Sequence, residues 1–117
     1  MKIILYWLPS SLYAALIISM AFSPAPSLPT PNFDKLIHFF AYALLSFFCY
    51  NSLRASGSAK PVSYTVVIAI VIGTIDESLQ AFGGVRTASV YDLSADAIGA
   101  LFGVFVTKRI SRFNAEK

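Results

Sequence analysis

Four apolar stretches, each close to the length that crosses a bilayer, restrict what this chain can fold into. A hydrocarbon core of about 30 Å is crossed by about 20 apolar residues in helical form. The sequence predicts such helices at about residues 3–22, 36–53, 61–82 and 90–107. We therefore predict an all-α fold, a single domain over residues 1–117 built as an integral membrane bundle of four transmembrane helices.

The composition supports a membrane domain and narrows the chemistry. Charged residues make up 13% of the chain, whereas a soluble domain has about 25%, and the mean hydropathy is +0.67. The single cysteine, Cys49, lies within an apolar run, where we expect it to pack as a small apolar residue without an intrachain disulfide. With one histidine and one cysteine, the chain by itself cannot build a Cys/His zinc site.

The segments between the apolar stretches carry signals of helix ends. Residues 23–32 include four prolines, which favour an extended linker. Pro61 suits the first turn of a helix, and Ser89 followed by Asp92 fits a capping box at the start of the fourth helix. The first stretch has the leading Lys2 of a signal peptide. It exceeds the usual length of about 7–15 apolar residues, so we expect it to remain as a helix.

The basic residues predict an orientation. Lys and Arg in short loops stay on the cytoplasmic side, and with four spans both termini share a side. Seven of the nine basic residues lie on that side: Lys2, Arg54, Lys60, Lys108, Arg109, Arg112 and Lys117. We therefore predict a multi-pass membrane protein with both termini in the cytoplasm. The basicity then reflects topology and contact with the lipid bilayer, and nucleic acid is not an expected partner.

Ionisable residues gather at the opposite, outward ends of the predicted helices. Five of the six carboxylates fall there with the only histidine: Asp34, His38, Asp76, Glu77, Asp92 and Asp96. Lys35 and Arg86 lie on the same side, so five acids and two bases give it a net charge of −3. Ionisable groups near hydrocarbon are costly, and they are kept where they pair, line a wet cavity or do chemistry. We expect the functional site at this outward end.

Helical spacing places polar residues of the second and third helices on defined faces. Asp34, His38 and Tyr42 follow one another at four-residue intervals and form one stripe. Glu77 and Gln80 share a face of the third helix. Both faces therefore run from the interface towards the membrane interior.

The fourth helix combines acids with small residues. Asp92 and Asp96 lie on the same face as Gly99 and Gly103, which form a GxxxG pair. Small residues at this spacing let helix backbones approach closely. We expect the helices to touch near the centre and to open outward into a polar mouth. The same glycines could instead form a homodimer contact.

Several of these residues also have purely structural explanations. Asp92 can serve only the capping box, and Asp34 can simply lie at the positive end of a helix. Lys35 can extend its side chain to the membrane interface, and Arg86 can pair with Asp92 across the turn. Glu77 is harder to explain in this way. It lies about five residues inside the helix end, at a depth where a carboxylate needs a partner, a proton or water.

The outward end combines groups suited to acid–base chemistry. A histidine beside carboxylates can accept or donate a proton near neutral pH. His38 and the carboxylates beside it are therefore the groups that we expect to handle protons. The acids can also recruit a divalent cation, which together with Arg86 and Lys35 would hold a phosphate or pyrophosphate head group. Without a cation, a mouth of net charge −3 should repel that group.

Three motifs follow one another in the polar part of the chain. They read DKLIHF at 34–39, ESLQAF at 77–82 and RTASVYDLSADAIG at 86–99. Their order and spacing resemble those of the VanZ-like family, whose pattern runs D-K-x-x-H-F, E-x-x-Q-x-F and R-x-x-S-x-x-D-x-x-A-[ND]-x-x-G. The chain departs from this pattern at Gly84-Val85, where the family often has Pro-Gly, and at Asp96, where many members have Asn.

The resemblance implies a small bacterial multi-span protein of the cytoplasmic, or inner, membrane. On its motifs we select His38 and Glu77 as the catalytic, proton-handling pair and assign ligand contacts to six further residues: Asp34, Lys35, Gln80, Arg86, Asp92 and Asp96. The family is named for a protein associated with resistance to the glycopeptide teicoplanin, which acts on cell-wall precursors outside the cytoplasmic membrane. The resemblance thus implies an envelope or lipid-linked ligand and a link to glycopeptide resistance. Two other functions stay open from the sequence. One is a non-catalytic interaction subunit, and the other is a small proton- or ion-coupled carrier.

Overall fold

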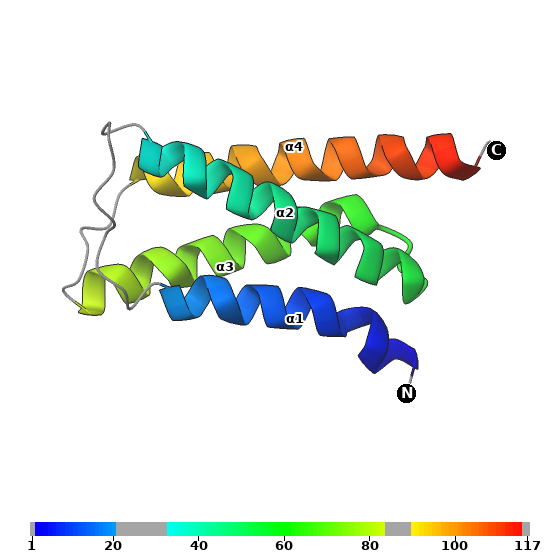
Figure 1. The fold of residues 1–117 in the computed structure, drawn as a ribbon, viewed down its shortest axis with the longest axis horizontal. Coiled ribbons are helices and arrows are strands. Elements are labelled where there is room, and N and C mark those ends of the chain that lie inside the picture. The colour runs from blue at the N-terminus through cyan, green and yellow to red at the C-terminus, as the bar shows by residue number, and fades with distance from the viewer. Residues whose placement is uncertain (1, 21–32, 84–89, 116–117) are drawn as a thin grey trace.

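The computed structural model is a bundle of four helices, and it describes residues 2–20, 33–83 and 90–115. The helices are α1 (Lys2–Met20), α2 (Phe33–Ala55), α3 (Pro61–Gly83) and α4 (Val90–Ala115). They lie side by side along the long axis of the molecule (Figure 1), which measures 46 × 29 × 20 Å. The predicted all-α fold is confirmed for the described residues.

The helix boundaries follow the local signals in the sequence. Pro61 is the first residue of α3, where its missing N–H leaves no hydrogen bond unmade. The turn before it contains Gly57 at φ +85°, a conformation that glycine adopts at little cost. The fourth helix begins at Val90 as predicted, but it continues to Ala115, beyond the predicted end at 107. Ser89 of the expected capping box lies outside the described residues.

Only two of the four predicted transmembrane spans are supported by length and composition. They are Leu36–Ala55 in α2 and Pro61–Phe82 in α3. The apolar stretch Ile4–Met20 in α1 is shorter, and α4 does not meet the same criteria. The four-helix bundle is therefore established as a fold, whereas its crossing of a membrane four times is not.

The described side chains place apolar groups outside and many polar groups inside, the reverse of a soluble protein. Large hydrophobic residues are exposed on every helix, among them Leu12, Phe40, Val67 and Phe105. The buried polar residues include Ser10, Ser46, Ser52, Thr65 and Thr107. Exposing so many apolar side chains is unfavourable in water and is not unfavourable in lipid.

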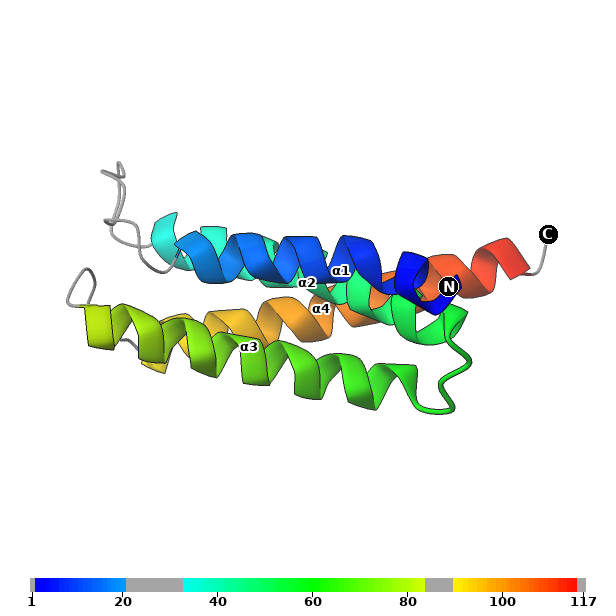
Figure 2. The same ribbon diagram turned by 90° about the horizontal axis from the view of Figure 1, so that it is seen from below.

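The closest packing joins α2 and α4, which run parallel to each other (Figures 1 and 2). A Cβ atom added at Gly99 would overlap the backbone of Phe39, and one added at Gly103 would overlap the backbone of Ala43. The two glycines are thus required for contact with α2 of the same chain. In this single chain α2 covers the face that carries Gly99 and Gly103, and a homodimer through these glycines stays a prediction.

The first helix is attached to α2 by hydrogen bonds at the end remote from the acids. Ser10 and Ser52 share a hydrogen bond of 2.6 Å between their hydroxyls, and Ser52 also donates to the carbonyl of Tyr6. Nearer the middle, the hydroxyl of Tyr13 donates to the carbonyl of Ala41 at 3.0 Å. These bonds fix α1 on α2 and leave the opposite end of the bundle to the ionisable residues.

Candidate functional site

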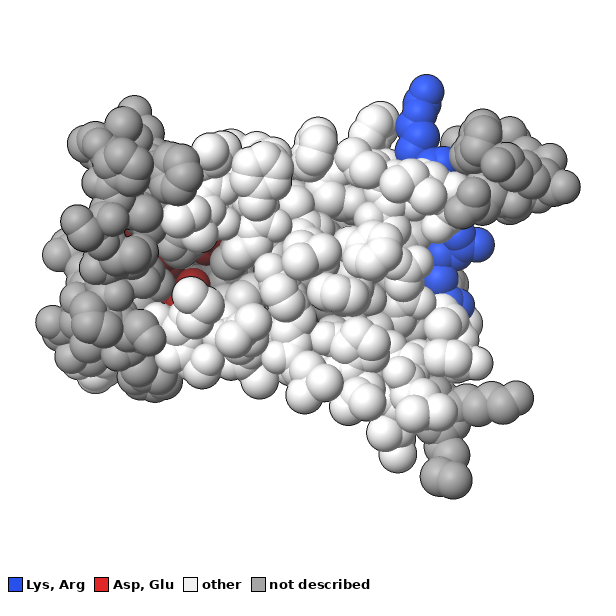
Figure 3. Space-filling model, viewed as in Figure 1, with Lys and Arg blue, Asp and Glu red and all other residues white. Residues whose placement is uncertain are grey.

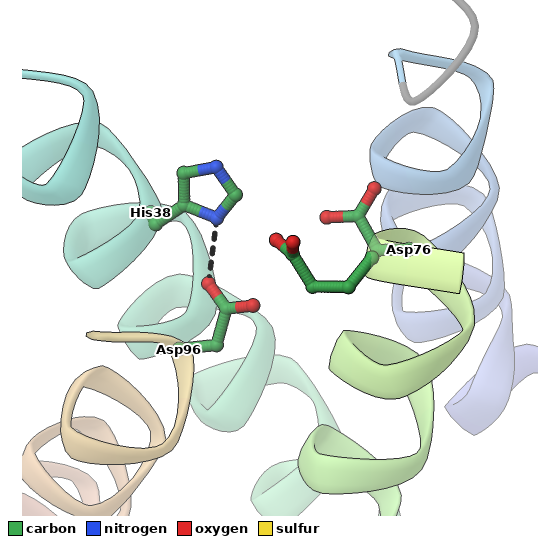
Figure 4. A group of neighbouring side chains, drawn as sticks. His38, Asp76 and Asp96 are labelled. Atoms are coloured by element: carbon green, nitrogen blue, oxygen red, sulfur yellow. Dashed lines mark hydrogen bonds and ion pairs between the residues drawn. The ribbon is translucent and has the colours of Figure 1, made fainter. Parts of the chain in front are cut away.

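Four ionisable side chains from three helices meet at the end of the bundle where α2 and α4 begin and α3 ends (Figure 4). His38 comes from α2, Asp76 and Glu77 come from α3, and Asp96 comes from α4. All four are buried, and one nitrogen or oxygen atom from each lies within 4.8 Å of the others. We call these four residues the His–carboxylate cluster.

A hydrogen bond between α2 and α4 holds one side of the cluster. The Nδ1 atom of His38 lies 2.7 Å from Oδ1 of Asp96, and both side chains are buried. The imidazole ring lies parallel to the ring of Tyr42, with 6.5 Å between the ring centroids. The spacing of His38 and Tyr42 on one helical stripe, as predicted from the sequence, is thus observed. Their shared face fixes the position of the imidazole.

Asp76 holds the other side of the cluster. Its Oδ1 accepts a hydrogen bond of 3.2 Å from the Nε2 of Gln80, one turn further along α3. Its Oδ2 accepts a bond of 3.3 Å from the hydroxyl of Tyr42 on α2. These two donors orient the carboxylate towards the centre of the cluster.

The second oxygen of Asp96 is the most unusual atom of the cluster. The residue is only 1% exposed, yet its Oδ2 accepts no hydrogen bond from any described residue. A Cβ atom added at Gly73 would lie 3.2 Å from this oxygen, so the glycine leaves it room against α3. A buried carboxylate oxygen without a donor is costly, and it calls for an explanation.

The electrostatic surroundings add to that cost. The described Lys and Arg side chains lie at the opposite end of the bundle, as Figure 3 illustrates: Arg54, Lys60, Lys108 and Arg109. Removing a carboxylate from water costs several kcal/mol even after the protein relaxes. Three carboxyl groups converging on one point therefore need protons or a cation.

The structure brings together half of the eight site residues that the sequence predicted. His38, Glu77 and Asp96 belong to the cluster, and Gln80 contacts it through Asp76. Asp92 is also buried, one turn before Asp96, but it lies outside the group of ligand-forming atoms. The side chains of Asp34 and Lys35 and the whole of Arg86 are outside the described part of the chain.

Two features of the cluster add to the sequence-based assignment. His38 and Glu77, which we expected to work together, both belong to the cluster, and Nδ1 of His38 also forms a hydrogen bond with Asp96 on α4. Asp76 was not assigned to the site, yet one of its oxygens lies among the four ligand-forming atoms, and its carboxylate accepts hydrogen bonds from Tyr42 and Gln80. Its position four residues before Gln80 was the signal that could have identified it.

These observations define a class of small helical membrane proteins with a buried histidine–carboxylate cluster at one end. The particular family follows from comparison with known sequences, because the VanZ/LLP1 family matches residues 3–111. The chain therefore belongs to the VanZ/LLP1 family.

One curated relative is a protein of the fission yeast Schizosaccharomyces pombe that is described only as uncharacterized. It is 30% identical over 103 residues, which cover 87% of this chain and 63% of the relative. The chain thus spans less than two thirds of that protein. No solved structure matches the chain.

Proposed function

We propose that this chain is a four-span membrane protein that binds a phosphate-bearing, lipid-linked head group at the outward mouth of its bundle. The observation that carries the proposal is the burial of His38 and three carboxyl groups at one end of a bundle with an apolar exterior. Buried ionisable groups in a membrane domain are expensive and are kept mainly where they act on a ligand, an ion or a proton.

The exterior of the bundle supports four crossings. Exposed large hydrophobic side chains lie on α1 and α4 as well as on the two helices that meet the length criterion, for example Leu12, Leu16, Ile98 and Phe105. The 26 residues of α4 correspond to a helix of about 39 Å, long enough to cross a hydrocarbon core of about 30 Å and to extend beyond it.

The charge distribution supports an outward cluster. The described basic side chains lie at the end where α1 begins and α4 ends (Figure 3), and the positive-inside rule puts that end in the cytoplasm. The cluster then lies near the outer leaflet of a bacterial inner membrane. A polar head group can reach it there, while an attached lipid chain stays in the bilayer.

Within this proposal, the cluster residues have different tasks. His38, held by its hydrogen bond to Asp96, lies where it can contact the head group or a cation bound to that group. Lys35 and Arg86 would contact the anionic oxygens. A role in teicoplanin resistance stays a prediction from the family resemblance.

Binding of a short polyprenyl pyrophosphate tests the proposal. The purified chain in nanodiscs of zwitterionic lipid is titrated with farnesyl pyrophosphate in a buffer that contains Mn²⁺, and farnesol serves as the uncharged control. We expect saturable binding of the pyrophosphate only. We also expect binding at least tenfold weaker in His38→Ala and Glu77→Gln.

The matched control is Thr74→Val on α3. Thr74 is exposed and donates to the carbonyl of Ile70, so its replacement leaves the cluster intact. We expect this variant to bind like the wild-type chain. Equal binding of farnesol and farnesyl pyrophosphate, or unchanged binding in both His38→Ala and Glu77→Gln, would contradict the proposed function.

A further inference from the structure

We propose that the His–carboxylate cluster binds one divalent transition-metal cation through side chains of His38, Asp76, Glu77 and Asp96. The inference deepens the proposed function and rests on it for the biological purpose of the ion. Its ligands, however, are defined by the geometry of the buried side chains.

The first argument is convergence. One potential ligand atom from each of the four residues lies within 4.8 Å of every other. Two ligands on opposite sides of an ion are about 4.2–4.4 Å apart when each bond is 2.1–2.2 Å long. Shifts of a few tenths of an ångström in the ligand atoms therefore suffice to bring all four groups within bonding distance of a single ion.

The second argument is the state of Asp96. Its Oδ2 is buried and accepts no hydrogen bond from the described residues. If two carboxyl groups shared a proton here, the pair would form a short oxygen–oxygen hydrogen bond on this atom, and none of the described residues makes one. A cation supplies the missing partner, and the absence of a side chain at Gly73 leaves Oδ2 free to turn towards it.

The third argument is that one of the potential ligands, Asp76, is oriented by hydrogen bonds. Carboxylates that bind metals are usually oriented by hydrogen bonds from outside the coordination sphere. Asp76 has this support, because Gln80 donates to one of its oxygens and Tyr42 donates to the other. The cluster thus has both potential ligands and the residues that would hold a ligand in place.

The choice of ion follows from the ligand types. Ca²⁺ and Mg²⁺ prefer oxygen ligands alone, whereas imidazole together with carboxylates suits Zn²⁺, Mn²⁺ or Fe²⁺. The ion would replace the proton between Nδ1 of His38 and Oδ1 of Asp96, which are 2.7 Å apart. Adjacent ligands of an ion lie about 3.0–3.4 Å apart, so this pair would open slightly. The neutral imidazole then carries its proton on Nε2.

The bound ion also explains how an acidic mouth can accept an anion. Three ionised carboxylates with a neutral imidazole carry a charge of −3, which repels a phosphate. One divalent cation reduces this to −1 and leaves room for a phosphate oxygen in its coordination sphere. The cation is thus the element that makes the proposed head-group binding electrostatically possible.

Metal titration tests the inference directly. The full chain, purified in detergent without a polyhistidine tag and stripped with EDTA, is titrated with Mn²⁺ by electron paramagnetic resonance and with Zn²⁺ against a chromophoric chelator. We expect one ion per chain with a micromolar dissociation constant. We also expect a loss of at least tenfold in affinity in Asp96→Asn and in Glu77→Gln.

Thr74→Val is again the matched control and should bind the ion like the wild-type chain. Circular dichroism and gel filtration show whether each variant is folded, and both isosteric variants keep the size of the original side chain. Failure of the stripped wild-type chain to bind either ion at millimolar concentration would overturn the inference. So would unchanged affinity in folded Asp96→Asn and Glu77→Gln.

The two proposals fail in different ways. If Mn²⁺ binds to the cluster but farnesyl pyrophosphate does not bind, the cation site stands and the head-group function is wrong. If farnesyl pyrophosphate binds equally well in Mn²⁺ and in EDTA, and the stripped chain binds neither Mn²⁺ nor Zn²⁺, the head-group function stands and the cation site is overturned.

Discussion

Replacing Gly103 by alanine should separate α2 from α4 and weaken the whole bundle. The new Cβ atom would lie 2.8 Å from the Cα atom of Ala43. Carbon atoms in contact are normally about 3.5–4.0 Å apart, so the two backbones have to move apart by roughly 1 Å. The atoms that the new Cβ meets are backbone atoms of Ala43, and a backbone cannot turn aside as a side chain can.

The expected magnitude follows from two opposing effects. Overpacking costs about 1–3 kcal/mol, and a backbone obstacle puts Gly103→Ala at the upper end. Alanine regains about 1 kcal/mol because it favours the helix more than glycine does. The free energy of unfolding should therefore fall by about 2 kcal/mol, which lowers the folded-to-unfolded ratio roughly 30-fold.

Titration with SDS in mixed micelles, followed by circular dichroism, measures this change. The matched variant is Gly73→Ala in α3, where the added Cβ meets only side-chain atoms of Asp96 and Leu93 at 3.2 Å. Those atoms can turn aside, so we expect its stability to stay within about 1 kcal/mol of the wild-type value. If Gly103→Ala is as stable as the wild-type chain, the close contact between α2 and α4 is not present in the protein.

Two further predictions concern the cluster and the topology. Tyr42→Phe removes the hydroxyl that donates to Asp76. It should weaken Mn²⁺ binding about tenfold and lower the free energy of unfolding by less than about 1 kcal/mol. Unchanged Mn²⁺ affinity would mean that the hydroxyl does not orient the carboxylate. In a Cys49→Ser background, a membrane-impermeant maleimide should label a cysteine at position 86 from outside and not one at position 54, and the reverse pattern would place the cluster on the cytoplasmic side.

The sequence predicted the helices well because apolar stretches and prolines mark them directly. The starts of α3 and α4 fell at Pro61 and Val90 as expected. The end of α4 did not, because Lys108 and Arg109 end the apolar stretch while the backbone remains helical as far as Ala115. Hydropathy reports the solvent around a segment, and helical hydrogen bonding can continue beyond it.

Three members of the cluster, His38, Glu77 and Asp96, were assigned from the sequence, whereas Asp76 and the contacts within the cluster were not. Spacing places Asp76 and Glu77 next to each other on α3, and it cannot decide which of them turns towards α2 and α4. The partner of His38 depends on how α2 packs against α4, and Gly99 and Gly103 determine that packing. A GxxxG pair indicates a close contact without indicating which helix makes it.

The contact at these glycines also divides the cluster into a fixed half and a movable half. His38 precedes Phe39 by one residue, and Asp96 lies one turn before Gly99, so the backbone contact holds both side chains in register. Asp76 and Glu77 belong to α3, whose Gly73 faces side chains of α4. Entry and exit of anything that the cluster holds should therefore involve movement of the end of α3 that carries Asp76 and Glu77, relative to the closely packed pair α2 and α4.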